Sequence, residues 1–531
     1  MLPPDVRRLT PVIVALLVVP ASLPGRAMGA GASSPSVSAA VRGDFNGDGF
    51  ADLAAGVPGD DTAETNAGAV TVIRGGPRGV TASGNQLWTE DTPGLASSAR
   101  SGERFGSALA VGDFNGDGFA DLAVGAPHDV VGGAIPSAGA VEVLYGSRTG
   151  LRQAGNDQWT QNSFGVPGRA ARNNLFGSTL ASGDFNADGF ADLAVSAPQQ
   201  RVRGRYSAGS VTVLYGSRAG LRGVGSRMFT QASPGIVGRP GTLHLFGRSL
   251  AVGDFGRARA EDLAVGVPLD AGGGKPRAGS VTVLYGSSRG LHSKGSQRWT
   301  QDRSGVASLC ERADLFGWSL AAADFGKGSQ SDLAVGVPGE DLRAVTDAGA
   351  VNVLFGGSHG LHGPGSEFRS QDSPGIQGRA QSGDAFGSAL AAADFGLSGW
   401  ADLVVGVPGQ RVGTKAAAGA VNVVDGSRRG LVARGNRLWT RSSSGLVGRA
   451  QAGERFGDAL AAGQFGHSKR ADLAVGIGRH DLRSITGAGA VAVLYGSYKG
   501  LRASGNQLWT RDSPGISGRA SRDDHFGHAV A

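Results

Sequence analysis

A Phe-Gly pair returns at an almost constant interval along the chain, and this repeat limits the fold more than any other feature. The pairs begin at Phe105, Phe176, Phe246, Phe316, Phe386, Phe456 and Phe526. The first interval is 71 residues and each later one is 70 residues. A period of this length, kept through the chain, predicts one supersecondary unit that is stacked against copies of itself.

Three further markers keep the same phase. Asp-Leu followed by two Ala or Val residues begins at Asp52, Asp121, Asp192, Asp262, Asp332, Asp402 and Asp472. The run Ala-Gly-(Ala or Ser)-Val-x-Val begins at Ala67, Ala138, Ala208, Ala278, Ala348, Ala418 and Ala488. Trp-Thr or a related pair begins at Trp88, Trp159, Phe229, Trp299, Trp439 and Trp509, with Phe368 one residue out of phase. Each unit therefore carries four short β-type runs.

Four strands in each repeat, separated by turns rich in Gly, Pro and Ser, are typical of a propeller blade. We therefore predict an all-β fold, a seven-bladed β-propeller of four-stranded blades. The 92 glycines among 531 residues fit a chain with many tight turns. A string of separate domains is less favoured, because a unit of roughly 70 residues without a disulfide has a marginal core. The single Cys310 cannot form a disulfide within the chain.

The phase of the repeat also predicts the domain boundaries. The propeller is expected over residues 41–531, after a signal peptide at 1–32 and a short linker at 33–40. The blades are expected at about 41–104, 105–175, 176–245, 246–315, 316–385, 386–455 and 456–525. The first blade lacks its Phe-Gly half, and the closing segment 526–531 supplies one. We therefore predict that this segment completes the ring and removes an exposed sheet edge, either as a strand of its own or in competition with residues 36–43.

The N-terminus has the features of an export signal. Arg7 and Arg8 give a charged start, residues 12–19 form a short apolar run, and residues 30–32 form a small-residue cleavage site. The apolar run is short for a transmembrane span, with an uncleaved anchor and a twin-arginine route as alternatives. We expect a secreted or cell-surface protein whose mature chain has no transmembrane span.

An acidic nine-residue loop ends on the Asp-Leu marker of the first three repeats, at residues 44–52, 113–121 and 184–192. Oxygen-bearing side chains stand at positions 1, 3, 5 and 9, a glycine stands at position 6, and position 7 offers its backbone carbonyl. Hard oxygen ligands in this order are typical of a calcium loop. The predicted ligands are Asp44, Asn46, Asp48, Phe50, Asp52, Asp113, Asn115, Asp117, Phe119, Asp121, Asp184, Asn186, Asp188, Phe190 and Asp192. We expect Ca2+ at about three sites; the alternative is an Asx-rich surface turn that binds no ion.

The corresponding loops of the later repeats lose the Asn and Asp ligands at positions 3 and 5. These loops are residues 254–262, 324–332, 394–402 and 464–472. Arg257 and Arg259 in the first of them, and Lys327 in the second, lead to the hypothesis that a basic side chain replaces the metal ion there. A solvated turn is the alternative, and the sequence does not decide whether any of the four binds an ion.

Basic residues recur at two positions of the repeat, in a chain of formal net charge +7. One set lies in a Gly-Ser turn and comprises Arg78, Arg148, Arg218, Arg289, Arg429 and Lys499. The other set precedes the Phe-Gly pair and comprises Arg169, Arg239, Arg379, Arg449 and Arg519. In a propeller such positions form two cationic circles, which serve either solubility or contact with an anionic cell-wall polysaccharide. Nucleic acid is not expected, because no aromatic stacking residues accompany the charge.

Signs of catalysis are weak. Residues 286–290 and 356–360 each fit the G-x-S-x-G pattern, but both fall at one turn of the repeat and not at a strand-to-helix elbow. The nine histidines, among them His128, His244 and His525, show no metal-ligand spacing. No P-loop or dinucleotide fingerprint opens a helix. We therefore expect that the chain is not an enzyme.

The markers resemble the FG-GAP repeats of the integrin α-chain head and of bacterial secreted relatives. The resemblance covers residues 41–531 and depends on Phe105-Gly106, the loop 113–121, Gly125-Ala126-Pro127 and their equivalents. It implies a seven-bladed propeller with calcium held in a β-hairpin loop, and a place in adhesion or ligand recognition. The recognition loops of that family do not carry over to any residue here. Arg42-Gly43-Asp44 spells the tripeptide that integrins bind, but Asp44 is already assigned to a calcium loop.

The sequence thus predicts a calcium-binding, integrin-like propeller that acts as a non-catalytic adhesion or ligand-recognition module at the cell surface. Its expected partner is a protein or polysaccharide of unknown identity. A secreted hydrolase or carbohydrate-active protein on a propeller scaffold is the alternative, and a purely structural surface protein is a third.

Overall fold

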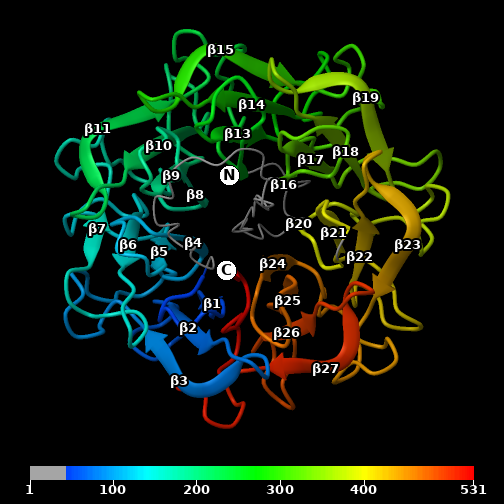
Figure 1. Cartoon of the computed structure of the whole chain (residues 1–531). Coiled ribbons are helices and arrows are strands. Elements are labelled where there is room, and N and C mark those ends of the chain that lie inside the picture. The colour runs from blue at the N-terminus through cyan, green and yellow to red at the C-terminus, as the bar shows by residue number, and fades with distance from the viewer. Residues whose placement is uncertain (1–42, 397) are drawn as a thin grey trace, which may run out of the picture.

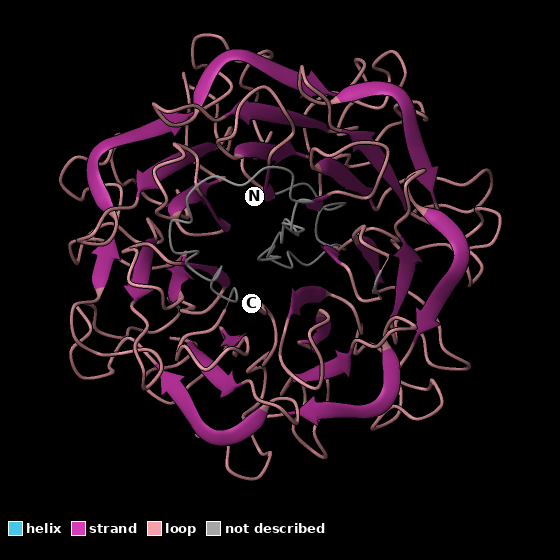
Figure 2. Ribbon diagram, viewed as in Figure 1, coloured by secondary structure: helices cyan, strands magenta, loops and turns pink. Residues whose placement is uncertain are grey.

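The computed structural model of the chain describes residues 43–396 and 398–531. The predicted signal peptide at 1–32 and linker at 33–40 lie outside the described residues. Seven small sheets surround a common axis, and the strands of each sheet are ordered from the centre of the ring to its rim (Figure 1). Every regular element in the described residues is a strand (Figure 2). The predicted seven-bladed all-β propeller is confirmed.

The strands of each blade pair antiparallel in chain order. The innermost strands are β4(Ala108–Gly112), β8(Leu180–Gly183), β12(Leu250–Gly253), β16(Leu320–Ala323), β20(Leu390–Ala393) and β24(Ala459–Gly463). The second strands are β1(Leu53–Val57), β5(Asp121–Ala126), β9(Asp192–Ala197), β13(Asp262–Val267), β17(Asp332–Val337), β21(Asp402–Val407) and β25(Asp472–Ile477). The third strands are β2(Ala69–Arg74), β6(Ala140–Leu144), β10(Ser210–Tyr215), β14(Ser280–Tyr285), β18(Ala350–Phe355), β22(Ala420–Asp425) and β26(Ala490–Tyr495). The outermost strands are β3(Thr81–Trp88), β7(Asp157–Trp159), β11(Arg222–Phe229), β15(His292–Trp299), β19(His362–Arg369), β23(Val432–Trp439) and β27(Arg502–Trp509).

The C-terminal residues close the ring by completing the first blade, whose sheet otherwise holds only β1, β2 and β3. The amide of Ala54 donates to the carbonyl of Ala531 over 2.9 Å, and the amide of Ala531 donates back over 3.0 Å. One step along, the amide of Gly56 donates to the carbonyl of Ala529 over 2.8 Å. The segment therefore lies at the innermost place beside β1, where Ala55 and Val530 form an isolated antiparallel bridge, and residues 36–42 of the alternative lie outside the described residues.

The Phe-Gly pair of one blade meets the Ala-Gly marker of the blade before it. The amide of Phe105 donates to the carbonyl of Ala67 over 2.7 Å, and the Phe105 ring is fully buried. A Cβ atom on Gly68 would lie 2.2 Å from the Phe105 carbonyl oxygen, so no larger residue fits between the two backbones. Two of the sequence markers thus recur because they form the two sides of each blade junction.

Successive connections leave the ring on alternate faces, because the strands of a blade are antiparallel. The connection from the first to the second strand, and that from the third to the fourth, lie on one face, which we call the loop face. The connection from the second to the third strand, and that from the fourth strand to the next blade, lie on the opposite face. The predicted calcium loops lie on the loop face, beside the Gly-Ser turns at residues 146–150 and their equivalents.

Candidate metal centre

The side chains of the first acidic loop fold it onto its own backbone amides. The Asp44 Oδ1 atom accepts hydrogen bonds from the amides of Gly47 and Asp48 over 2.6 and 3.1 Å, and its Oδ2 atom accepts one from Gly49 over 2.7 Å. The Asn46 Oδ1 atom accepts from the Asp48 amide over 2.8 Å, and the Asp48 Oδ1 atom accepts from the Phe50 amide over 3.0 Å. These are Asx-type turns, and they bring positions 1, 3 and 5 into one compact loop.

The second and third acidic loops repeat this arrangement. The Asp113 carboxylate accepts hydrogen bonds from the amides of Gly116, Asp117 and Gly118 over 2.6 to 3.1 Å. In the third loop the Asp184 carboxylate accepts from Asp188 and Gly189 over 3.1 and 2.9 Å. Three consecutive blades therefore present the same oxygen-rich loop on the same face.

The aspartate at position 9 has a structural role that the sequence analysis did not assign. The buried Asp52 accepts a hydrogen bond from the Phe45 amide at Oδ2 over 3.1 Å and one from the Gly75 amide at Oδ1 over 2.9 Å. The carboxylate thereby fastens the loop to the end of the third strand. The same kind of pair holds Asp121, Asp192, Asp262, Asp332, Asp402 and Asp472. The signal was present in the sequence, because this aspartate persists in the four loops that have lost positions 3 and 5.

The charge in the three complete loops suits a cation. Burial, together with the smaller effect of the nearby charges of Asp44 and Asp48, raises the pKa of Asp52 to about 7 against the opposing hydrogen bonds from Gly75 and Phe45. Burial likewise raises the pKa of Asp121 to about 7 and that of Asp192 to about 8. A divalent ion beside these groups would relieve the repulsion, and positions 1, 3, 5 and 7 offer the hard oxygen atoms that Ca2+ prefers.

The donor set of each loop mixes carboxylates with an amide oxygen and a backbone carbonyl. Within residues 43–396 and 398–531, no three Asp, Glu, His or Cys side chains are grouped so that they could hold a metal ion by themselves. The residues thus fit the ion by the type of donor atom, and the assignment of the fifteen ligands stays a prediction.

The acidic loops also join neighbouring blades. The Asp44 carbonyl accepts a hydrogen bond from the Ala120 amide of the next loop over 3.0 Å, and the Phe45 carbonyl accepts one from Ser147 over 3.1 Å. The Phe119 ring of the second loop packs on the first, since a Cβ atom on Gly47 would lie 2.7 Å from Phe119 Cε1. An ion that orders one loop would therefore also stiffen the junction to the next blade.

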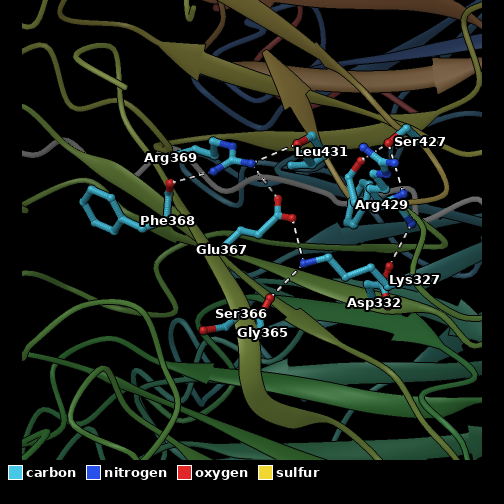
Figure 3. A network of polar contacts seen from close by, with 12 residues as sticks. Lys327, Asp332, Gly365, Ser366, Glu367, Phe368, Arg369, Ser427, Arg429 and Leu431 are labelled. Carbon is cyan, nitrogen blue, oxygen red and sulfur yellow. Dashed lines mark hydrogen bonds and ion pairs between the residues drawn. The ribbon is translucent and has the colours of Figure 1, made fainter. Parts of the chain in front are cut away.

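The basic residues of the fourth and fifth loops reach outward to the rim. The Arg257 guanidinium lies 3.7 Å from the centre of the Tyr285 ring and donates to the carbonyls of Gly295 and His359 over 2.8 and 2.9 Å. The Lys327 ammonium lies 2.9 Å from the Glu367 carboxylate, on β19 (Figure 3). These partners belong to the outer strands and turns. Burial raises the pKa of Asp262 and Asp332 to about 8, and the charges of Arg257 and Lys327 act against that rise, so the hypothesis that a basic side chain replaces the metal ion stays a prediction.

The other motifs lie at turns of the repeat. The residues 286–290 form the turn between β14 and β15, where Ser287 Oγ donates to the Gly290 carbonyl over 2.8 Å, and 356–360 form its equivalent. Asp44 is buried with its carboxylate held by loop amides, so it does not display the tripeptide 42–44. A cavity of about 200 Å³ lies beside the second and third loops, lined by Asp113, Asp184 and Glu261 among others.

The three repeats with complete acidic loops match a known family of repeats. The family model for the FG-GAP repeat matches residues 36–73, 105–144 and 176–214. The first three blades carry FG-GAP repeats. The matched ranges contain the three complete acidic loops, and the structure shows that the remaining blades share their architecture.

Curated relatives match parts of the FG-GAP propeller. It is 35% identical over 162 residues to phosphatidylinositol-glycan-specific phospholipase D of Rattus norvegicus, which covers 30% of this chain and 18% of the relative. It is 30% identical over 269 residues to integrin alpha-8 of Mus musculus, which covers 49% of this chain and 22% of the relative. The matched part thus spans about a fifth of the length of these relatives.

A solved structure also aligns with the FG-GAP propeller. It is that of the exotype rhamnogalacturonan lyase YesX, at a TM-score of 0.37 and 11% identity, over 88% of this chain and 76% of that one. The part of the propeller that the structure describes contains no helix long and apolar enough to cross a membrane.

Proposed function

We propose that this FG-GAP propeller is an exported, calcium-binding recognition module that holds a partner without catalysing a reaction. The observation that carries the proposal is the surface of the opposite face. The connections there expose the side chains of Phe164, Leu309 and Tyr206 to 88%, 74% and 63%. The same set of connections exposes Arg169, Arg239, Arg379, Arg449 and Arg519. Exposed aromatic and apolar groups beside arginine are the composition of a recognition surface.

The loop face has a different composition. Its Gly-Ser turns expose Arg78, Arg148, Arg218, Arg289, Arg429 and Lys499. Among these turns only that of the seventh blade exposes a large apolar side chain, Tyr498, within the described residues. We therefore assign partner contact to the opposite face and calcium binding to the loop face. The proposed partner is an anionic cell-wall polymer, because its charge complements the arginine circle.

A binding experiment with matched variants tests this assignment. The double variant R169E/R239E reverses two charges on the opposite face, and R148E/R218E reverses two on the loop face in the same two repeats. Binding to immobilised teichoic acid, with dextran as the neutral control, should weaken at least tenfold in the first variant and change little in the second. Binding should also fall with rising salt. Equal behaviour of the two variants, or no saturable binding by the parent chain, would refute the assignment.

A catalytic role is the second candidate, and the similarity to phosphatidylinositol-glycan-specific phospholipase D favours it. Incubation of the purified chain with a phosphatidylinositol-glycan-anchored protein separates the two candidates. We expect no release of the anchored protein, whereas release that is lost on substitution of a single acid or histidine would establish an enzyme.

A further inference from the structure

Three polar side chains occupy equivalent positions at every junction between blades. The first lies two residues after the Trp-Thr position, the second lies two residues before the Phe-Gly pair, and the third lies just after the second strand of the next blade. At six junctions they are Gln161, Asn174 and Gln200; Gln231, His244 and Asp270; Gln301, Asp314 and Glu340; Gln371, Asp384 and Gln410; Arg441, Glu454 and His480; and Arg511, Asp524 and Asp60. All of these connections belong to the opposite face, away from the acidic loops.

At four of these six junctions the first residue is a glutamine that donates a hydrogen bond to the third residue, and at the other two it is an arginine that forms an ion pair. Gln161 Nε2 donates to Gln200 Oε1 over 2.8 Å, and Gln301 Nε2 donates to Glu340 Oε2 over 2.6 Å. In the last junction the guanidinium of Arg511 pairs with Asp60. A glutamine or arginine thus lies between acceptors from the neighbouring segments, which compensates for the burial of these polar groups.

The junction between the first and second blades lacks this donor. Its three residues are Glu90, Glu103 and Asp129, and Glu142 of β6 adds a fourth carboxylate. Glu90 and Glu142 are each only 1% exposed, and neither oxygen of either carboxylate has a hydrogen-bond partner. Two unpartnered carboxylates buried together are unfavourable unless a positive species neutralises them.

The charged surroundings of this cluster are mostly negative. Burial raises the pKa of Glu90 to about 10, and the charges of Glu103, Asp129 and Glu142 add to the effect. Burial raises the pKa of Glu142 to about 7, the nearby Ser97 hydroxyl and amide act to lower it, and the charges of Asp129 and Asp157 act to raise it. The neighbouring cation is Arg100, whose charge acts on Asp129 while its Nη1 atom donates to the Val130 carbonyl over 3.4 Å. Glu103 is held by the amides of Arg100 and Val130.

We propose that a divalent metal ion of the calcium type binds between the first and second blades, held by Glu90 and Glu142 together with Glu103 or Asp129. The four unpartnered oxygens of Glu90 and Glu142 are hard ligands of the kind that Ca2+ takes. A proton can bridge only one pair of oxygens, whereas a divalent ion offsets two charges and contacts several carboxylates at once. Because no three acidic side chains in the described part of the chain already lie at metal-binding spacing, the ion would draw these side chains together.

The repeat supplies matched variants for the test. E90Q installs the glutamine found at four other junctions, so it should fold and restore the missing donor. Q161E places a glutamate at the second junction as the converse control. The substitutions D48N, D117N and D188N weaken the three acidic loops at exposed positions, and this triple variant serves as the background in which the junction site is counted separately.

Calcium titration calorimetry of the full chain should find one remaining site in the triple background, and E90Q should remove it or weaken it at least tenfold. In calcium-free buffer E90Q should raise Tm, and added calcium should raise the Tm of the triple variant but not that of its E90Q derivative. Q161E should lower Tm in calcium-free buffer. An unchanged stoichiometry and calcium response in E90Q would overturn the proposal. A triple variant that binds no calcium, and whose Tm depends only on pH, would also overturn the proposal. It would show that bound protons, not a metal ion, neutralise these carboxylates.

Discussion

The position-9 aspartates permit a sharp test of whether these carboxylates are structural, because a blade with a complete acidic loop can be compared with one that lacks it. Asp192 belongs to a complete loop and Asp332 to a degenerate one, and both are fully buried. Each accepts two backbone amides, over 2.9 Å in all four cases. We predict that D192N and D332N destabilise the propeller by similar amounts.

The expected magnitude follows from the hydrogen bonds. An asparagine offers one acceptor oxygen, so one backbone amide stays satisfied while the other faces the NH2 group and loses its partner. Leaving one buried amide unsatisfied costs about 2–3 kcal/mol of the free energy of unfolding. For a propeller of this size, an unfolding entropy of about 2 cal/mol/K per residue turns that cost into a fall in Tm of about 2–3 °C.

Thermal melting of the two variants measures the fall in Tm with and without calcium. About 5 mM calcium saturates loops of this kind, and excess chelator empties them. The fall in Tm of D332N should be the same in both buffers. A normal Tm for D332N, together with a large fall for D192N only when calcium is present, would show that position 9 is chiefly a metal ligand and would refute the reasoning.

Three further predictions concern the metal, the closure of the ring and pH. Chelation should lower the stability of the parent chain by about 1.4 kcal/mol for each loop that calcium occupies at ten times its Kd, so a melting curve unchanged by chelator would contradict calcium binding. Removal of residues 527–531 leaves β1 with an unpaired edge, and size-exclusion chromatography should show association or aggregation, while an unchanged monomer with the parent Tm would contradict the closure. In calcium-free buffer, burial raises the pKa values of Glu90, Glu103 and Glu142 to about 10, 7 and 7, so the folded state holds protons that the unfolded chain releases. The contribution of these groups to stability should be full below about pH 4.5 and fall as pH rises through about 7 toward 10, and E90Q should show a shallower fall in Tm than the parent over this range.

The fold could be predicted from the sequence because its determinants recur at one phase. Phe105 and Gly68 form the two sides of a blade junction, and their equivalents have to be the same residue types wherever two backbones approach this closely. The same phase placed Ala531 at the position that the first blade lacks. The phase of the repeat therefore predicted both the strands within each blade and the closure of the ring.

The site was predicted less completely, for two physical reasons. Asp52 can serve as a ligand or as an acceptor of backbone amides, and composition alone does not separate these roles. The carboxylate cluster at Glu90 combines four segments of two blades, and its members are ordinary acids when each is read alone. A comparison of all copies at that repeat position would have shown that glutamate replaces a donor only there. The contacts of Lys327 could not be predicted from the sequence, because its length lets it also reach Glu367 on β19.

The pairing of Gly56 with Ala529 has a consequence for synthesis. Most of the described residues separate these two segments, so the first blade to leave a ribosome waits for residues 529–531 before its innermost edge is covered. Until then the sides that will meet at the seam are both open. Chaperones that bind bare strand edges would therefore find their target at the first blade for as long as translation of this region continues.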